Sequence, residues 1–246
     1  MKDLSVLLGE KMGQIIPRLN QSTDQESTQA TQNLSKHSNK PDLSRAIDGH
    51  TYSAKTTRDL RPLWAKSIPE CFRRLSIENC KEVPFRILTE CLENLINRIS
   101  LFFYGEWGCG KTTTAFALIN QIMEISSGNF WPRYMSAREL DNHLLNASRS
   151  EFGDAYELQK LSECDLLFID DLCKIQPTER FKSQLFEIIN KRYLDKKITI
   201  ITSNKNLDQM GAIFDGSIVS RMMDKSVWDV VKFEDVDLRK NQSKPF

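Results

Sequence analysis

The fold of this chain is decided by one eight-residue run, Gly105-Glu106-Trp107-Gly108-Cys109-Gly110-Lys111-Thr112. The run matches the pattern G-x-x-x-x-G-K-[ST] and lies between an apolar, strand-like segment at 100–104 and a helical pattern at 111–125. Glycines allow backbone N–H groups to wrap a polyphosphate, and the N-terminus of the following helix adds partial positive charge. The sequence therefore predicts a phosphate loop between a strand and a helix.

This loop assigns roles to individual side chains. Lys111 can reach the β and γ phosphates of a nucleotide, and the hydroxyl of Thr112 can ligate Mg²⁺. We therefore predict ATP and Mg²⁺ as cofactors. Cys109 and Trp107 are interpreted as filler within the loop rather than as a redox-sensitive thiol or a recognition group. The predicted nucleotide-binding residues in this region are Gly105, Glu106, Trp107, Gly108, Cys109, Gly110, Lys111, Thr112 and Thr113.

A second motif is an apolar strand, predicted at 165–169, followed by the adjacent carboxylates Asp170 and Asp171. Paired acids after a strand often form only a helix N-cap and its neighbour. Beside a phosphate loop, however, one acid can support Mg²⁺ and the next can orient and activate the attacking water. The preceding phosphate loop favours this second interpretation, with Asp170 at the metal and Asp171 as the catalytic acid.

The run at 198–203 is a third apolar strand, and it delivers Asn204 at its tip. Because sites in parallel sheets form at the carboxyl ends of strands, we expect Asn204 to face the same crevice as Lys111 and Asp170. There it could hydrogen-bond the γ-phosphate or the lytic water. Taken alone, an asparagine at this point is more typical of a turn.

Strand and helix patterns alternate from residue 100 onward, which predicts a mainly parallel sheet with helices on both faces. The expected strands are 100–104, 133–136, 165–169, 198–203 and 227–233, and the expected helices are 111–125, 137–147, 154–162 and 178–194.

The N-terminal region has a different composition. Apolar residues at 2–19 favour one face of a short helix, whereas 20–40 is polar and predicts a flexible linker. A lone amphipathic helix is marginal in isolation, so we expect it to dock onto its own core or onto a partner. The predicted organisation is a partner-docking region at 1–60 and a globular domain at 61–246.

Composition excludes several classes of protein. The 246 residues carry 34 basic and 33 acidic side chains, a net charge of +1, which excludes nucleic-acid binding by bulk charge alone. The six cysteines include no C-x-x-C pair and no histidines at zinc-ligand spacing, so we expect reduced thiols in a cytoplasmic protein. The longest strongly apolar runs are strand-length, so we expect no membrane span.

Together the phosphate loop, Asp170-Asp171, Thr202-Ser203-Asn204 and Ser220-Arg221-Met222 resemble the AAA+ ATPases, and within them the DnaC/IstB group of helicase loaders and transposition helpers. The segments 68–72 and 185–193 resemble the same group, although Cys173 stands where that group often has glycine. The resemblance implies an α/β fold: an AAA+ P-loop ATPase domain with a parallel five-stranded sheet sandwiched by helices and no separate lid domain.

The resemblance also implies roles for residues outside the loop. Asn204 would be the first sensor of nucleotide. Arg221 would be a finger that reaches the nucleotide of a neighbouring subunit, and Arg239 would sense nucleotide in place of a lid. Because an arginine supplied in trans neutralises charge at the γ-phosphate, hydrolysis would be slow and dependent on self-association into an ATP-dependent oligomer.

Basic residues near the predicted extra helical element suggest a route for single-stranded DNA. Arg133, Arg138 and Arg149 are interleaved with the aromatic or imidazole side chains of Trp131, Tyr134, His143 and Phe152. Such a mixture can follow a single-stranded backbone and stack its bases. The alternative is a solvated helix face whose aromatic side chains turn to the core.

Three functions remain open at this point. The first is an ATP-dependent loader that binds the replicative DNA helicase and single-stranded DNA during initiation of replication. The second is an IstB-like transposition helper that assembles on duplex DNA and recruits a transposase. The third is a nucleotide-switched adaptor with little hydrolysis, although Asp171, Asn204 and Arg221 would be unnecessary for occupancy alone.

Overall fold

Five parallel strands form one sheet in the order β2-β3-β4-β1-β5. Their bounds are β1 (Ser100–Tyr104), β2 (Pro132–Ser136), β3 (Leu166–Asp170), β4 (Ile198–Ser203) and β5 (Trp228–Lys232). The computed structural model describes residues 59–81, 83–149, 153–214 and 216–233. The predicted N-terminal helix, the linker and Arg239 therefore lie outside the described residues.

The three central strands are buried along almost their whole length. Consecutive apolar residues without alternation are expected where helices cover both faces of a parallel sheet. The register aligns Leu101 with Ile200, and Ile200 with Phe168. Because the strands are parallel and adjacent, the ends of β1, β3 and β4 reach the same edge of the sheet.

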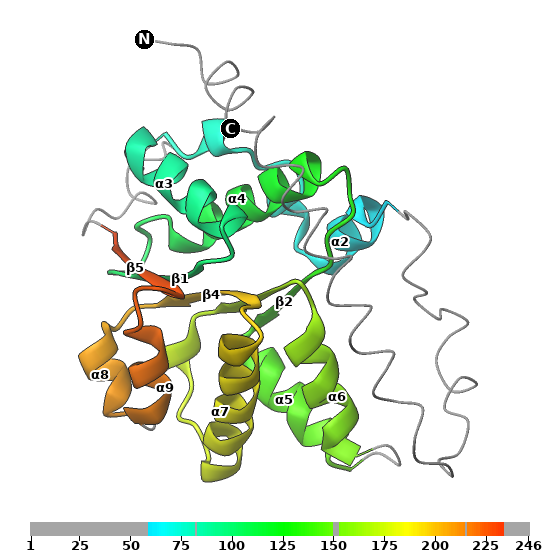
Figure 1. The fold of residues 1–246 in the computed structure, drawn as a ribbon, viewed down its shortest axis with the longest axis vertical. Coiled ribbons are helices and arrows are strands. Elements are labelled where there is room, and N and C mark those ends of the chain that lie inside the picture. Colours follow the sequence, from blue (N-terminus) through cyan, green and yellow to red (C-terminus); the bar gives the residue numbers. More distant parts are fainter. Residues whose placement is uncertain (1–58, 82, 150–152, 215, 234–246) are drawn as a thin grey trace, which may run out of the picture. The chain divides into compact units, whose positions relative to one another are not determined.

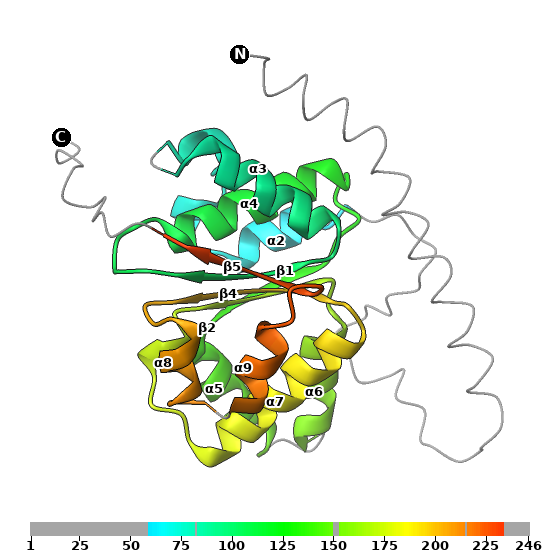
Figure 2. The ribbon, with the colours of Figure 1, turned by 60° about the vertical axis from the view of Figure 1, so that its left-hand side comes forward.

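Two layers of helices enclose the sheet (Figures 1 and 2). One face carries α2 (Arg61–Ser67), α3 (Phe85–Ile96) and α4 (Lys111–Ile125). The other carries α5 (Ala137–Ala147), α6 (Gly153–Glu163), α7 (Glu179–Leu194), α8 (Leu207–Gly211) and α9 (Gly216–Met222). The 3-10 helices are η2 (Glu70–Phe72), η3 (Ile77–Asn79) and η4 (Leu172–Lys174). The predicted parallel five-stranded sheet sandwiched by helices is confirmed.

Local sequence signals set several helix starts. Ser136 and Glu139 form a reciprocal capping box at α5, and the Thr178 hydroxyl accepts from the backbone N–H of Phe181 at α7. The predicted strands and helices are therefore confirmed, with boundaries shifted by a residue or so. The helices α2, α3, α8 and α9 were not predicted from the sequence.

Within the described residues, no helix combines the length and the hydropathy that crossing a bilayer would require.

Candidate functional site

Three hydroxyl and carboxyl side chains meet at the carboxyl edge of the sheet. Thr112, in the first turn of α4, donates a hydrogen bond of 2.7 Å to Oδ1 of Asp170 at the end of β3. Thr202, near the end of β4, donates to the same oxygen at 2.5 Å. Asp170 is 8% exposed. The fold therefore brings the phosphate-loop threonine and the first acid of the pair into direct contact.

Burial raises the pKa of the Asp170 carboxyl above its ordinary value, and the hydrogen bonds from Thr202 and Thr112 offset only part of this effect. Carboxylate and hydroxyl oxygens are ligands that Mg²⁺ prefers. The described residues contain no group of three or more His, Cys, Asp or Glu side chains arranged to hold a metal. A Mg²⁺ ion held here would therefore complete its shell with phosphate oxygens and water, as is usual for this ion.

Lys111 is folded back onto its own loop. Its ammonium donates hydrogen bonds of 2.8 Å to the carbonyl oxygens of Gly105 and Glu106, and it lies 3.5 Å from Sγ of Cys109. The side chain is 5% exposed. A buried ammonium that bonds only neutral groups retains a strong preference for an anion. The Cys109 thiol is also buried and donates to the Glu106 carbonyl at 2.9 Å, in agreement with a filler role.

Two glycines give the loop its shape. Gly110 precedes α4 with φ 92°, in the left-handed region that favours glycine. A Cβ added to Gly105, which has φ 151°, would lie 2.7 Å from the carbonyl oxygen of Phe233, just after β5. These two observations explain why both fixed positions of the pattern, 105 and 110, are glycine.

Asp171 follows Asp170 in a left-handed conformation, with φ 55°. Its backbone N–H donates to the Thr202 hydroxyl at 2.8 Å, and its carboxylate pairs with the Lys174 ammonium at 3.3 Å. The hydrogen bond to the Thr202 hydroxyl stabilises the strained backbone conformation of Asp171. Strained residues of this kind are common at functional sites. Asn204 stands one residue beyond β4 at the same edge, but it is not among the described residues that line the cavity.

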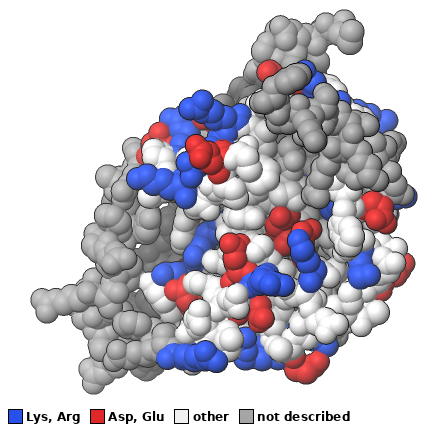
Figure 3. Space-filling view, turned by 180° about the vertical axis from the view of Figure 1, so that it is seen from behind, with Lys and Arg blue, Asp and Glu red and all other residues white. Residues whose placement is uncertain are grey.

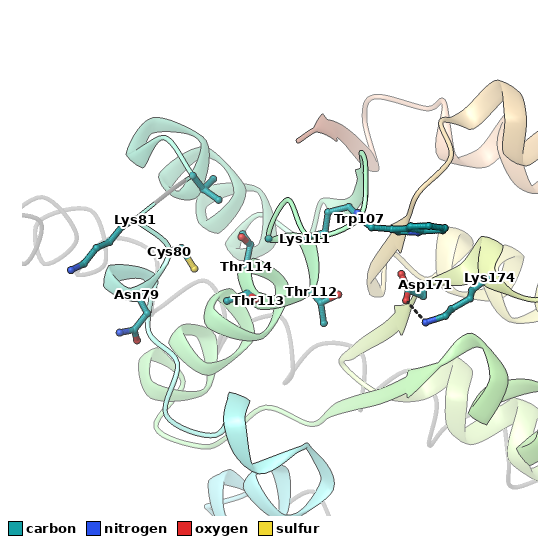
Figure 4. A pocket seen from close by; sticks show the side chains of 13 residues that line it. Asn79, Cys80, Lys81, Trp107, Lys111, Thr112, Thr113, Thr114, Asp171 and Lys174 are labelled. Carbon is teal, nitrogen blue, oxygen red and sulfur yellow. Dashed lines mark hydrogen bonds and ion pairs between the residues drawn. The ribbon is translucent and has the colours of Figure 1, made fainter. Parts of the chain in front are cut away.

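A cavity of about 440 Å³ lies along the loop (Figure 4). This volume is within the usual range for small-molecule sites. Its described lining residues are Asn79, Cys80, Lys81, Val83, Trp107, Gly108, Gly110, Lys111, Thr112, Thr113, Thr114, Asp171 and Lys174. Figure 4 shows Asn79 to Lys81 at one end and Trp107, Asp171 and Lys174 at the other.

Sequence reasoning did not predict Lys174 or the wall of the cavity formed by Asn79, Cys80, Lys81 and Val83. The segment that leads into this wall packs on α4. Asn120 of α4 donates hydrogen bonds of 2.9 Å to the carbonyl oxygens of Phe72 and Leu75. The Phe72 ring also stacks on Phe116 of α4, with ring centroids 4.3 Å apart. The only local signal was the capping box at η3. It predicts a helix start and says nothing of a cavity.

Arg221 lies on α9 and is bonded to other residues of the same chain. Its Nε donates to Oδ1 of Asn190 at 2.7 Å, a terminal nitrogen donates to the Ser217 carbonyl at 2.9 Å, and the guanidinium stacks on the Phe186 ring 4.6 Å from its centroid. The side chain is half-buried. None of these partners lines the cavity described above.

The residues proposed for single-stranded DNA divide into two groups. Tyr134 packs against Phe116 and Phe168, with centroids 4.9 and 5.3 Å away, and burial raises the pKa of its hydroxyl. The half-buried Tyr134 ring is engaged by these two core rings, which favours the alternative of an aromatic side chain turned to the core. Nε2 of His143 lies 2.8 Å from Oε2 of Glu157, so this side chain is also bonded within the protein. Arg138 and Arg149 are exposed, and Phe152 lies outside the described residues.

On the face shown in Figure 3, basic and acidic side chains lie interspersed. This distribution agrees with the net charge of +1. A contact of nucleic acid with this face would therefore depend on particular basic side chains rather than on a broad basic field.

Comparison with known proteins adds family information. The chain matches the family model described as the bacterial DnaA ATPase domain over residues 88–226, more than half its length. It is 30% identical over 122 residues to the chromosomal replication initiator protein DnaA of Lactiplantibacillus plantarum, which covers 49% of this chain and 26% of that protein. The chain thus spans about a quarter of the length of this curated relative.

Solved structures are similar to about two thirds of this chain or less. A replication initiator DnaA bound to AMPPCP and single-stranded DNA has a TM-score of 0.52 and 25% identity, covering 61% of this chain and 44% of that one. The DnaC helicase loader has a TM-score of 0.52 and 22% identity, covering 60% and 86%. The second likeness concerns the fold alone.

Proposed function

This chain belongs to the bacterial DnaA ATPase domain family of AAA+ proteins, and from that premise we propose that it binds and hydrolyses ATP in the initiation of DNA replication. The observation that carries the proposal is the junction of Thr112, Asp170 and Thr202 beside the buried ammonium of Lys111. A relative of this family was solved with the ATP analogue AMPPCP.

In this proposal the nucleotide lies along the loop cavity. Lys111 gives up its hydrogen bonds to the loop carbonyl oxygens and binds the phosphates instead. Thr112 and Asp170 would hold Mg²⁺, which when bound would neutralise charge on the phosphate oxygens. Asp171, whose carboxylate lines the cavity, orients and deprotonates the attacking water. The wall at the opposite end of the cavity, where the nucleoside would lie, is formed by Asn79, Cys80, Lys81 and Val83.

Hydrolysis is proposed to be slow in the single chain. The bonded partners of Arg221, Asn190 and Ser217, do not line the cavity of their own chain, and this supports the proposal that Arg221 serves another subunit after self-association. Asn204 and Arg239 are proposed as nucleotide sensors. Phe233 lies beside Gly105 of the loop, and Arg239 follows Phe233 by six positions in the sequence, which supports a role for Arg239 near the nucleotide.

More specifically, we propose a loader of the replicative helicase that also contacts single-stranded DNA. The support is the DnaC-like character of residues 68–72 and 185–193 and the predicted amphipathic segment at 2–19, which would be the helicase-docking arm. The exposed Arg138 and Arg149 are the DNA contacts we favour. Such a protein would act in the cytoplasm, where bacterial replication takes place.

The testing experiment is native mass spectrometry of the full chain mixed with the replicative helicase of its host, with Mg²⁺ and ATP. We expect a complex, lost when Leu8→Asp and Met12→Asp place two charges on the predicted docking face. Lys111→Ala would lose the nucleotide response of the complex while leaving the docking arm intact.

Two outcomes would redirect the proposal. Assembly on duplex DNA with ATP and no helicase complex would favour a transposition helper that recruits a transposase. ATP binding with no measurable turnover in any assembly would favour a nucleotide-switched adaptor.

A further inference from the structure

The hydroxyl of Thr202 is bonded to both members of the acidic pair. Its oxygen accepts a hydrogen bond of 2.8 Å from the backbone N–H of Asp171, and the hydroxyl donates to Oδ1 of Asp170 at 2.5 Å. A hydroxyl has one hydrogen and two lone pairs, so it can make both bonds at once. Thr202 is fully buried, so bulk water does not compete for either bond.

The register of the sheet explains why a side chain makes this link. The ladder between β3 and β4 ends at the pair Ile169 and Ile201, one residue before Asp170 and Thr202. On its other side β4 stays paired with β1, where Thr202 is aligned with Phe103. The backbone of Thr202 is therefore fixed by β1, and its hydroxyl continues the contact with the end of β3.

The backbone of Asp171 determines where its carboxylate lies. A residue with a Cβ adopts the left-handed φ of 55° only at a cost in free energy. Among the described residues, the Asp171 side chain makes no capping hydrogen bond to η4, which begins at the next residue. Asp171 instead lines the cavity, where its carboxylate pairs with Lys174 at 3.3 Å (Figure 4).

Thr202 itself stands back from the cavity. It is not among the described residues that line the cavity, whereas Asp171 is. Asn204, the residue expected to sense nucleotide, follows two positions later and lies beyond the end of β4. An effect of Thr202 on hydrolysis would therefore pass through the acids that it holds rather than through contact with the nucleotide.

We propose that Thr202 is a positioning residue for ATP hydrolysis, which holds the backbone of Asp171 so that its carboxylate faces the attacking water. This role rests on the proposed function, because it takes Asp171 as the group that activates that water. Misplacing a catalytic group by about 1 Å can cost about 10²-fold in rate, so loss of the Thr202 hydroxyl should act on turnover.

The first test compares ATP turnover with AMPPCP binding in the full chain. Thr202→Val keeps the shape of the side chain and removes the hydroxyl. It should lower kcat at least about tenfold, while the Kd for AMPPCP changes by less than about threefold. Thr202→Ser retains the hydroxyl and should recover most of kcat. A valine variant with the wild-type kcat, or a serine variant as slow as the valine variant, would overturn the positioning role.

Thr199→Val is the matched control on the same strand. Thr199 is 1% exposed, and its hydroxyl accepts from Nε of Arg192 instead of bonding the acidic pair. Both valine variants lose a buried hydrogen bond, so both should melt at a lower temperature than the wild type. Only Thr202→Val should lose turnover, and an equal loss of kcat in both would attribute the effect to stability and overturn the positioning role.

Two further measurements separate action through Asp171 from action through Asp170. Saturating Mg²⁺ should not restore the turnover of Thr202→Val, and restoration would place the effect at the proposed metal site instead. Added to Asp171→Asn, Thr202→Val should lower kcat by less than about threefold further, because the group that it positions is already lost. Restoration by Mg²⁺ or a fully multiplicative loss would overturn the positioning of Asp171.

Hydrogen exchange at the Asp171 amide, measured by NMR, requires neither Mg²⁺ nor nucleotide. In the nucleotide-free full chain this amide should exchange at least about tenfold faster in Thr202→Val than in the wild type, because its acceptor is gone. Thr202→Ser should stay protected. Equal protection in all three proteins would show that the hydroxyl does not hold this backbone, and would overturn the positioning role.

Failure of the positioning role is distinguishable from failure of the proposed function. A wild type that neither binds nor hydrolyses ATP overturns the proposed function, and with it the role of Asp171 on which the positioning depends. A wild type that hydrolyses ATP at a rate that Thr202→Val shares overturns the positioning role alone.

Discussion

The hydroxyl of Thr112 lies 2.7 Å from Oδ1 of Asp170, 58 positions away along the chain. This contact joins the first turn of the helix after the phosphate loop to the last residue of β3. Both groups belong to the proposed Mg²⁺ site, so the fold itself brings the two motifs into contact.

Replacing Thr112 with alanine should weaken Mg²⁺-dependent nucleotide binding. The substitution removes a proposed ligand and a hydrogen bond to Asp170, and we expect Mg²⁺ affinity in the presence of ATP to fall about 10- to 100-fold. Magnesium titrations of ATP turnover measure this change. Thr112→Ser retains the hydroxyl and should recover most of the affinity. Equal loss in both variants would argue against a role for the hydroxyl.

Asp170→Asn should stabilise the protein at neutral pH in the absence of Mg²⁺. Burial raises the pKa of Asp170 in the folded state, so the folded protein binds this proton more tightly than the unfolded chain does. Stability contributed by the protonated group is present below the ordinary aspartate pKa and is lost as pH rises through the raised folded value. The amide oxygen can still accept from Thr112 and Thr202.

The check is thermal unfolding in EDTA as a function of pH. The melting temperature of Asp170→Asn should exceed that of the wild type at pH 7. The difference should shrink as pH falls through the raised folded pKa of Asp170, and it should vanish below about 4, where the carboxyl is protonated in both the folded and the unfolded chain. A difference that stays constant with pH would exclude charge burial as its cause. The same variant should lose ATP turnover.

Arg221→Ala should leave nucleotide binding intact and remove assembly-dependent turnover. An arginine supplied in trans contributes about 10³-fold or more to phosphoryl-transfer rates, so we expect a loss of that order in ATP turnover. Arg180→Ala is the control, since Arg180 is bonded to Gln184 and Asp141 within the same layer of helices. Unchanged turnover in Arg221→Ala would remove this residue from the proposed mechanism.

Arg192 should prove important for stability rather than for activity. Its guanidinium is 1% exposed, and it donates to the Thr199 hydroxyl and to the carbonyl oxygens of Leu161, Ser162, Cys164 and Ile198. Arg192→Met would leave these acceptors buried without a donor, so we expect a loss of about 3 kcal/mol or more in the free energy of unfolding.

Urea denaturation measures the effect of Arg192→Met. Arg192→Lys should recover little, because one ammonium cannot reproduce the several directions of the guanidinium donors. Recovery by lysine to near wild-type stability would show that the charge alone matters at this position.

Several parts of the architecture followed from local sequence. The glycine pattern at 105–112 predicts the loop, because only certain residues adopt its backbone conformation and bind phosphate there. The continuous apolar runs at 166–170 and 198–203 predict buried parallel strands, and the capping residues Ser136 and Thr178 mark helix starts. Each signal lies within a few residues, so it does not depend on the rest of the chain.

The long-range arrangement required the tertiary structure. The sheet order places β3 and β4 side by side and so brings Thr202, rather than Asn204, into hydrogen-bonding contact with Asp170. The packing of η2 and η3 on α4 supplies the wall of Asn79, Cys80, Lys81 and Val83. The packing of α9 on α7 brings Arg221 to Asn190.

Sequence alone therefore determined which chemistry this protein carries: the phosphate loop, the paired acids, and the strands that end beside them. Tertiary structure decided which side chains reach that chemistry. The sequence leaves Tyr134 open as a base-stacking residue, whereas in the structure its half-buried ring packs against Phe116 and Phe168. The physical reason is that motifs and periodicity are local properties, whereas burial and contact depend on strand order and on which helix face meets which sheet face.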